Sequence, residues 1–204
     1  MALALLASAC LSSSAKPKSK HHTTTGQTQP SEITLPPQTS KESCVPVVTG
    51  GLSSDFLDPD VSVRSGPVVF DRLLANRGDP SDYQPVAPGR YDPTKTLVLL
   101  RKGHFALVEV SKSQHHVVSL LFDQSKLAPG QSAAVTDGAP AVVFRNCPTT
   151  TTSAWIEYPG AFIVAGPRCA RVEVTPLKPG TRVPAGKTVK LKIPFGRKMC
   201  GKRS

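Results

Sequence analysis

The sequence lacks the features that mark several common classes of protein. No apolar run reaches the roughly 18 residues of a membrane-spanning helix, and only 5% of the 204 residues are aromatic. The chain has no Gly-x-Ser-x-Gly, His-Glu-x-x-His or Gly-x-x-x-x-Gly-Lys-Ser/Thr motif, and no helix-turn-helix or zinc-finger signature. These absences argue against a multi-span membrane protein, and no motif predicts a cofactor, a metal or a nucleic-acid partner.

Proline, by contrast, is abundant, with 20 residues along the chain. Each proline removes a backbone donor and crowds the preceding turn, so long helices are not expected. Short runs rich in Val, Leu and Ile are separated by Gly, Pro and Asp at a spacing of roughly 8–12 residues, which indicates an all-β fold. In the last run, Lys190 and Lys192 share one face and Leu191 and Ile193 the other. We predict an antiparallel β-sandwich, immunoglobulin-like or similar, with a polar turn at 112–115 and a Pro-Gly turn at 159–160. The predicted strands are 60–64, 66–74, 96–101, 104–111, 116–122, 132–136, 141–146, 155–158, 161–165, 171–175 and 188–195.

The N-terminus resembles an export signal that ends in a lipidation site. Residues 2–9 form a short apolar run, and small residues precede Cys10, as in a bacterial lipobox. Residues 11–43 contain almost no hydrophobic side chains, so we expect a disordered polar stalk that leads to a folded domain at 44–204. The protein is therefore predicted to be exported, and to be either a lipoprotein held at the outer face of the membrane through Cys10 or a secreted protein.

The five cysteines agree with an exported protein. If Cys10 carries lipid, then Cys44, Cys147, Cys169 and Cys200 remain, an even number in a compartment that permits disulfides. Four cysteines allow three pairings, and the sequence does not choose among them. We favour Cys147–Cys169 together with Cys44–Cys200, because the second pair would close a long loop and so constrain the unfolded chain most. Zinc is not expected, since the chain contains no Cys-x-x-Cys pair.

Several segments of the domain carry a resemblance to known sequences. They are Ser-Gly-Pro-Val-Val-Phe at 65–70, Ala-Val-Val-Phe-Arg-Asn-Cys at 141–147, the stretch at 160–169 that reads Gly-x-Phe-x-Val-Ala-Gly-x-Arg-Cys, and Ile-Pro-Phe-Gly at 193–196 before Cys200. In this order they resemble small secreted, lipoprotein-like proteins of actinobacteria. The resemblance covers about 60–204 and implies an exported, cysteine-bearing β domain. It implies no activity, ligand or catalytic residue.

The net charge of +11 is concentrated near the C-terminus. Residues 168–204 hold eleven Lys and Arg and a single acid, whereas 44–167 hold ten basic and eleven acidic residues. Such asymmetry attracts polyanions, and for an exported protein these would be phospholipid headgroups or anionic wall polymers. Two simpler explanations stay open, namely lysines that protect a sheet edge from pairing and a solvated chain end. The anion-binding candidates are Lys190, Lys192, Arg197 and Lys198.

Nothing in the sequence forms a recognisable catalytic constellation, so we expect a non-catalytic envelope or binding protein. One alternative is a secreted wall or glycan hydrolase, which would need a cleft with a converging pair of carboxylates or histidines. Another is a carrier of small apolar ligands, which would need a cavity between the sheets. The residues open to the first alternative are expected in turns or at the surface: Asp58, Asp60, Asp79, Asp82, His104, His115 and His116.

Overall fold

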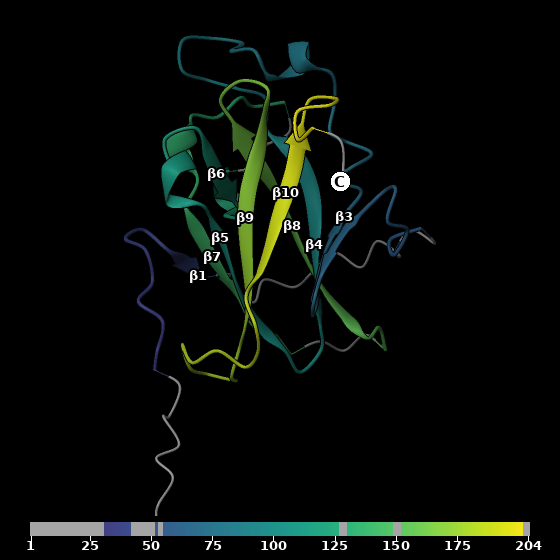
Figure 1. The fold of residues 1–204 in the computed structure, drawn as a ribbon, viewed down its shortest axis with the longest axis vertical. Coiled ribbons are helices and arrows are strands. Elements are labelled where there is room, and N and C mark those ends of the chain that lie inside the picture. The colour runs from purple at the N-terminus through teal and green to yellow at the C-terminus, as the bar shows by residue number, and fades with distance from the viewer. Residues whose placement is uncertain (1–30, 42–51, 53–54, 127–129, 149–151, 202–204) are drawn as a thin grey trace, which may run out of the picture.

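The computed structural model describes residues 31–41, 52, 55–126, 130–148 and 152–201. These residues form two five-stranded sheets packed face to face, with β9 and β10 in front of β4 and β8 in Figure 1. All neighbouring strands are antiparallel except β1 and β7, so the predicted all-β sandwich is confirmed. The helices of the described part are four 3-10 turns, and none is long and apolar enough to cross a membrane.

The first sheet has the order β1-β7-β5-β9-β10, and the second has the order β2-β3-β4-β8-β6. Strand β10 is therefore an edge strand, whereas β8 lies between two neighbours. In the first sheet the strands are β1 (Ser40–Lys41), β5 (Phe105–Val110), β7 (Ala141–Phe144), β9 (Arg168–Leu177) and β10 (Val189–Phe195). In the second they are β2 (Val63–Ser65), β3 (Val68–Asp71), β4 (Thr94–Arg101), β6 (Val118–Leu121) and β8 (Trp155–Val164).

The core lies between the two sheets and is dense in phenylalanine. Alternate residues of each strand point inward, as the period of two in a strand requires. The Phe122 and Phe144 rings lie 5.0 Å apart edge to face, and the Phe162 and Phe195 rings lie 5.2 Å apart. Burial of one such ring contributes about 1.5–3 kcal/mol. Five phenylalanines are fully buried, namely Phe70, Phe122, Phe144, Phe162 and Phe195.

The predicted turn at Pro159-Gly160 is wrong, because β8 runs unbroken through both residues. Leu120 of β6 exchanges both of its backbone hydrogen bonds with Ala139, on the side away from β8. Phe162, which lies opposite Leu120 in β8, therefore turns its backbone N–H and C=O groups toward β4. By alternation, the backbone of Pro159 faces the β6 side, at a point where β6 has already ended. A proline is tolerated there because no ladder donor is needed. Gly160 lies against the Phe122 ring, where a Cβ atom would come within 2.1 Å of Cδ1.

The strand predicted at 132–136 is also wrong. This stretch makes a single antiparallel bridge, between Ala133 and Tyr91, and then enters a 3-10 turn at Val135–Asp137. The Asp137 carboxylate accepts a hydrogen bond from the Ala134 N–H at 2.8 Å, which closes the turn locally. The stretch 132–136 therefore does not form a strand, because a local side-chain hydrogen bond turns the chain at Ala134. Elsewhere, the strand predicted at 188–195 and the turn at 112–115 are confirmed by β10 and by the 3-10 turn Lys112–Gln114.

Part of the predicted stalk packs onto the sandwich. Ile33 and Leu35 contact a second, smaller apolar cluster on the outer face of the first sheet, around Leu107 and Leu177. The Ile33 N–H donates to the Arg182 carbonyl at 3.0 Å. Strand β1 then pairs in parallel with β7. The stalk expected at 11–43 is thus ordered over 31–41, and the remainder of that range lies outside the described residues.

Candidate functional site

The candidate site lies along the unpaired edge of β10. The Arg171 N–H donates to the Gln114 side-chain oxygen at 2.7 Å, and the Arg171 carbonyl accepts from the Ser111 N–H at 2.8 Å. Arg171 therefore turns its backbone away from β10, and its partner Lys192 must turn its own backbone toward the free edge. The same alternation applies to Lys190. Two lysines thus present backbone N–H groups to the open side of the strand and exposed side chains to the outer face.

Beside this edge lies a groove of about 820 Å³. Its second wall comes from the segment before β2 and from the chain that follows β3, and one end is closed by the loop after β10. Four lining side chains are basic and one is acidic, so the groove carries a positive potential that favours anions. We call it the basic groove. Its lining residues are Pro59, Asp60, Leu74, Arg77, Lys190, Leu191, Lys192, Pro194, Lys198, Cys200 and Gly201.

Three of the four predicted anion-binding residues line the basic groove, and the fourth does not. Arg197 instead pairs with Asp79, with 2.9 Å between Nε and Oδ1. Lys190 lines the groove but also approaches Glu173, with 3.4 Å between Nζ and Oε1. That pair is solvated, since the Lys190 side chain is 79% exposed, so it holds the lysine only weakly. Within the described residues, Lys192 and Lys198 have no ion-pair partner.

Arg77 is a groove residue that the sequence analysis missed. Its carbonyl accepts hydrogen bonds from the Gly196 N–H at 2.9 Å and from the Tyr83 hydroxyl at 2.5 Å. The Tyr83 ring packs against Phe195 at 5.8 Å, so the two segments are fixed to each other at the end of β10. Arg77 lies in a Pro/Asp-rich stretch of ordinary loop composition. No local pattern could have linked it to lysines more than a hundred residues away.

The favoured disulfide pairing is wrong. Cys169 bonds Cys200, with Cα atoms 4.8 Å apart, and this excludes both Cys147–Cys169 and Cys44–Cys200. The error has a simple cause, because the hairpin of β9 and β10 brings Cys169 beside the chain that follows Phe195. Cys147 is also disulfide-bonded. Of the three pairings that these four cysteines allow, the one compatible with Cys169–Cys200 joins Cys147 to Cys44, which lies outside the described residues.

The carboxylates considered for catalysis act locally in turns. The Asp58 carboxylate accepts from the Asp60 N–H at 2.8 Å, and the Asp82 carboxylate accepts from the Asp79 N–H at 2.7 Å. A His115 ring nitrogen lies 2.7 Å from the Val110 carbonyl. These contacts are the Asx-type turns and surface hydrogen bonds expected of such residues. Among the described residues no group of three or more His, Cys, Asp or Glu side chains could hold a metal ion.

A different pair of carboxylates, not singled out from the sequence, lies on the outer face of the second sheet. Asp71 in β3 and Glu157 in β8 are only 6% and 9% exposed. Burial raises the pKa of Asp71, and burial together with the nearby negative charge of Asp71 raises the pKa of Glu157. Asp71 also accepts a hydrogen bond from Ser62 at 3.2 Å, and Ser62 accepts from the Arg72 N–H at 2.9 Å. The Asp71 carboxylate thus stabilises the turn after β3 through Ser62.

Comparison with known proteins gives no relative, since no family model, no curated protein and no solved structure matches the chain. The structure itself shows an all-β sandwich with a groove at one sheet edge, and most of the charged residues that line this groove are basic.

Proposed function

We propose that this protein is an exported, non-catalytic cell-envelope protein that binds anionic envelope components through the basic groove. The observation that carries the proposal is the groove itself, in which Arg77 joins Lys190, Lys192 and Lys198 around a concave surface. Each basic residue near an anionic surface contributes about 1 kcal/mol, so four of them acting together support binding with a dissociation constant of about 1 mM. The two edge-facing N–H groups add directional donors for phosphate or carboxylate oxygens.

The location of the protein in the cell envelope is part of the same proposal. It rests on the apolar run at 2–9, the small residues before Cys10 and the polar composition of 11–43. Cys10 lies outside the described residues. The intact mass of the protein purified from its native envelope tests this location. A diacylglyceryl adduct on a chain that starts at Cys10 supports a lipid-anchored envelope protein. An unmodified chain with a different start removes the lipid anchor from the proposal.

The main experiment reverses the charge of the groove. We compare the full chain, with Cys10→Ser so that no lipid is attached, with a variant that also carries Lys190→Glu, Lys192→Glu and Lys198→Glu. Binding is measured to phosphatidylglycerol vesicles and to linear polyphosphate, with phosphatidylcholine vesicles as the neutral reference. At about 1 kcal/mol for each lost cation, the variant should bind on the order of a hundredfold more weakly.

A matched control carries the same change of net charge away from the groove. Arg64, Lys95 and Arg101 are exposed residues of the second sheet, and their replacement by Glu leaves every groove residue in place. This control should keep more than half of the binding free energy. Equal loss in both variants would show a response to net charge alone, and unchanged binding in the groove variant would overturn the proposal.

Two alternative functions were open from the sequence. A carrier of apolar ligands needs a cavity between the sheets, and the buried phenylalanines that fill this space count against it. A glycan hydrolase is favoured by one observation, a pair of buried carboxylates, Asp71 and Glu157, whose pKa values are both raised by burial. Release of sugars from wall glycan by the wild type, but not by a Glu157→Gln variant, would move the function to that pair.

A further inference from the structure

One wall of the basic groove is built by a disulfide. Cys200 lines the groove and bonds Cys169, which belongs to β9 on the other side of β10 from the groove. Both cysteines are partly exposed, so a thiol or disulfide reagent in solution can reach them. The bond therefore joins the end of the described chain across the edge strand that carries Lys190 and Lys192.

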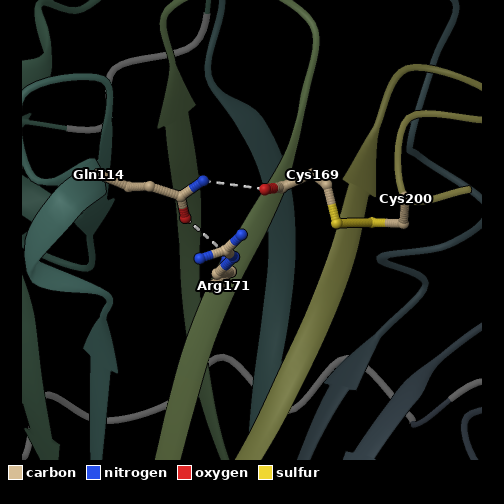
Figure 2. Close-up of a disulfide and its surroundings, with 4 residues drawn as sticks. All are labelled: Gln114, Cys169, Arg171 and Cys200. Atoms are coloured by element: carbon tan, nitrogen blue, oxygen red, sulfur yellow. Dashed lines mark hydrogen bonds between the residues drawn. A yellow bond between two sulfur atoms is a disulfide. The ribbon is translucent and has the colours of Figure 1, made fainter.

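The Cys169 end of this bond is firmly held. Figure 2 shows the Gln114 side chain beside the backbone of β9, where its amide nitrogen donates to the Cys169 carbonyl at 2.9 Å. Its oxygen accepts from the Arg171 N–H at 2.7 Å. The primary amide thus takes the place of a neighbouring strand at this point. Cys169 is fixed by the sheet and by Gln114 together.

The Cys200 end has much weaker support of its own. After the Gly196 N–H has bonded Arg77, the loop is held by the exposed ion pair of Arg197 with Asp79 and by two long backbone bonds. These bonds measure 3.4 Å from Met199 to Gly196 and 3.3 Å from Gly201 to Lys198. Lys198 has a φ of 67°, in the left-handed region that residues other than Gly, Asn and Asp rarely adopt. The conformation that places Lys198 on the groove wall therefore depends on the covalent tie at Cys200.

We infer that the Cys169–Cys200 disulfide switches on anion binding by holding Lys198 at the groove. This inference rests on the anion binding proposed above and adds its regulation. The two thiols become a disulfide by exchange with a disulfide oxidant: two electrons and two protons pass to that oxidant, which is released as two thiols. The reduced chain, as it exists before export, then binds polyanions weakly, and the oxidised exported chain binds them fully.

The test is a double-mutant cycle on the full chain with Cys10→Ser. The disulfide is removed by Cys169→Ser with Cys200→Ser, rather than by a reductant, so that the other cysteines are untouched. Affinity for labelled linear polyphosphate is read by fluorescence anisotropy. We expect removal of the disulfide and Lys198→Gln each to weaken binding about fivefold, the contribution of one basic residue. The combination should lose no more than either change alone, because both act on the same contact.

A second variant guards against a loss of fold in the serine protein. Two glycines inserted between Met199 and Cys200 keep the disulfide but release Lys198 from its position. This variant should show the same fivefold loss, while near-UV circular dichroism of Trp155 stays that of the wild type.

The possible outcomes separate the disulfide inference from the groove proposal. Wild-type affinity in the serine variant or in the glycine insertion overturns the disulfide inference and leaves the groove proposal standing. Additive losses in the cycle also overturn it, since the disulfide would then act elsewhere. Failure of the oxidised wild type to bind polyphosphate overturns both proposals.

Discussion

Strands β8 and β10 differ in what surrounds them, and this difference separates stability from binding. β8 lies between β4 and β6, and among its ten residues Pro159 is the one that is exposed. β10 has one neighbour, and its outward residues Lys190 and Lys192 are exposed while Ile193 and Phe195 are buried. Packing therefore constrains nearly every position of β8. The outer positions of β10 are free of that constraint and can carry charges for a ligand.

The largest effect is expected inside β8. Gly160→Ala places a Cβ atom 2.1–2.6 Å from three carbons of the Phe122 ring, a separation that real structures do not show. The ring must move into a filled core, so we expect a loss of about 3 kcal/mol in the free energy of unfolding. Urea denaturation measures it. The control is Gly186→Ala, where the nearest atom would be 3.8 Å away and stability should change by less than about 0.5 kcal/mol.

A compensating change sharpens this prediction. Phe122→Leu replaces the ring that opposes Gly160 with a smaller side chain. The double variant with Gly160→Ala should therefore lose less free energy of unfolding than the two single variants lose together. If the losses add instead, then Phe122 is not the group that excludes a side chain at Gly160.

A smaller effect of opposite sign is expected at Glu157, also in β8. Burial raises the pKa of this carboxyl above its ordinary 4.5, so the folded chain holds the proton more tightly than the unfolded chain does. The free energy of unfolding then falls as pH rises from the unfolded pKa through the folded one. Glu157→Gln removes the buried charge, and we expect it to raise stability at pH 7 by about 1 kcal/mol.

The pH dependence identifies the cause of that gain. Below about pH 4 the wild-type carboxyl is protonated in both states, so the advantage of the glutamine variant should vanish there. Thermal unfolding at pH 7 and pH 3.5 measures it. A gain that is equal at both values would point to packing of the amide rather than to the buried charge.

The smallest effect on stability is expected at the edge strand. The variant with Lys190→Glu, Lys192→Glu and Lys198→Glu, designed to weaken anion binding, alters exposed side chains only. We expect its free energy of unfolding to stay within about 0.5 kcal/mol of the wild type. Among the described residues, the ion pair that it breaks is the solvated one of Lys190 with Glu173. A marked loss of stability would mean that β10 is as constrained as β8, and would erase the distinction between them.

Much of this architecture follows from local pattern in the sequence. The alternation of lysine and aliphatic residues in β10 fixes both its strand character and its outward face. Pro159-Gly160 misled the same reasoning, because these residues normally mark turns. What permits them in β8 is non-local: β6 ends before Pro159, and Phe122 fills the space beside Gly160.

The candidate site was predictable only in part. Lys190, Lys192 and Lys198 are close in sequence, so their clustering shows in the charge pattern. Arg77 reaches the groove through a backbone bond to Gly196, and a backbone bond leaves no signature in residue type. The partner of Cys169 likewise depends on the register of the hairpin that precedes Cys200.

The parallel pairing of β1 with β7 has a mechanical consequence. A pulling force applied from the N-terminal side acts first on residues 31–41, which are held by two register positions of β1, the Ile33 bond to Arg182 and the contacts of Leu35. The ten-residue strands of the sandwich share far more hydrogen bonds and yield later. Peeling of this segment would lengthen the chain by about 35 Å at roughly 3.3 Å per residue. Residues 31–41 thus form an extensible segment that detaches under tension before the core or the basic groove is disturbed.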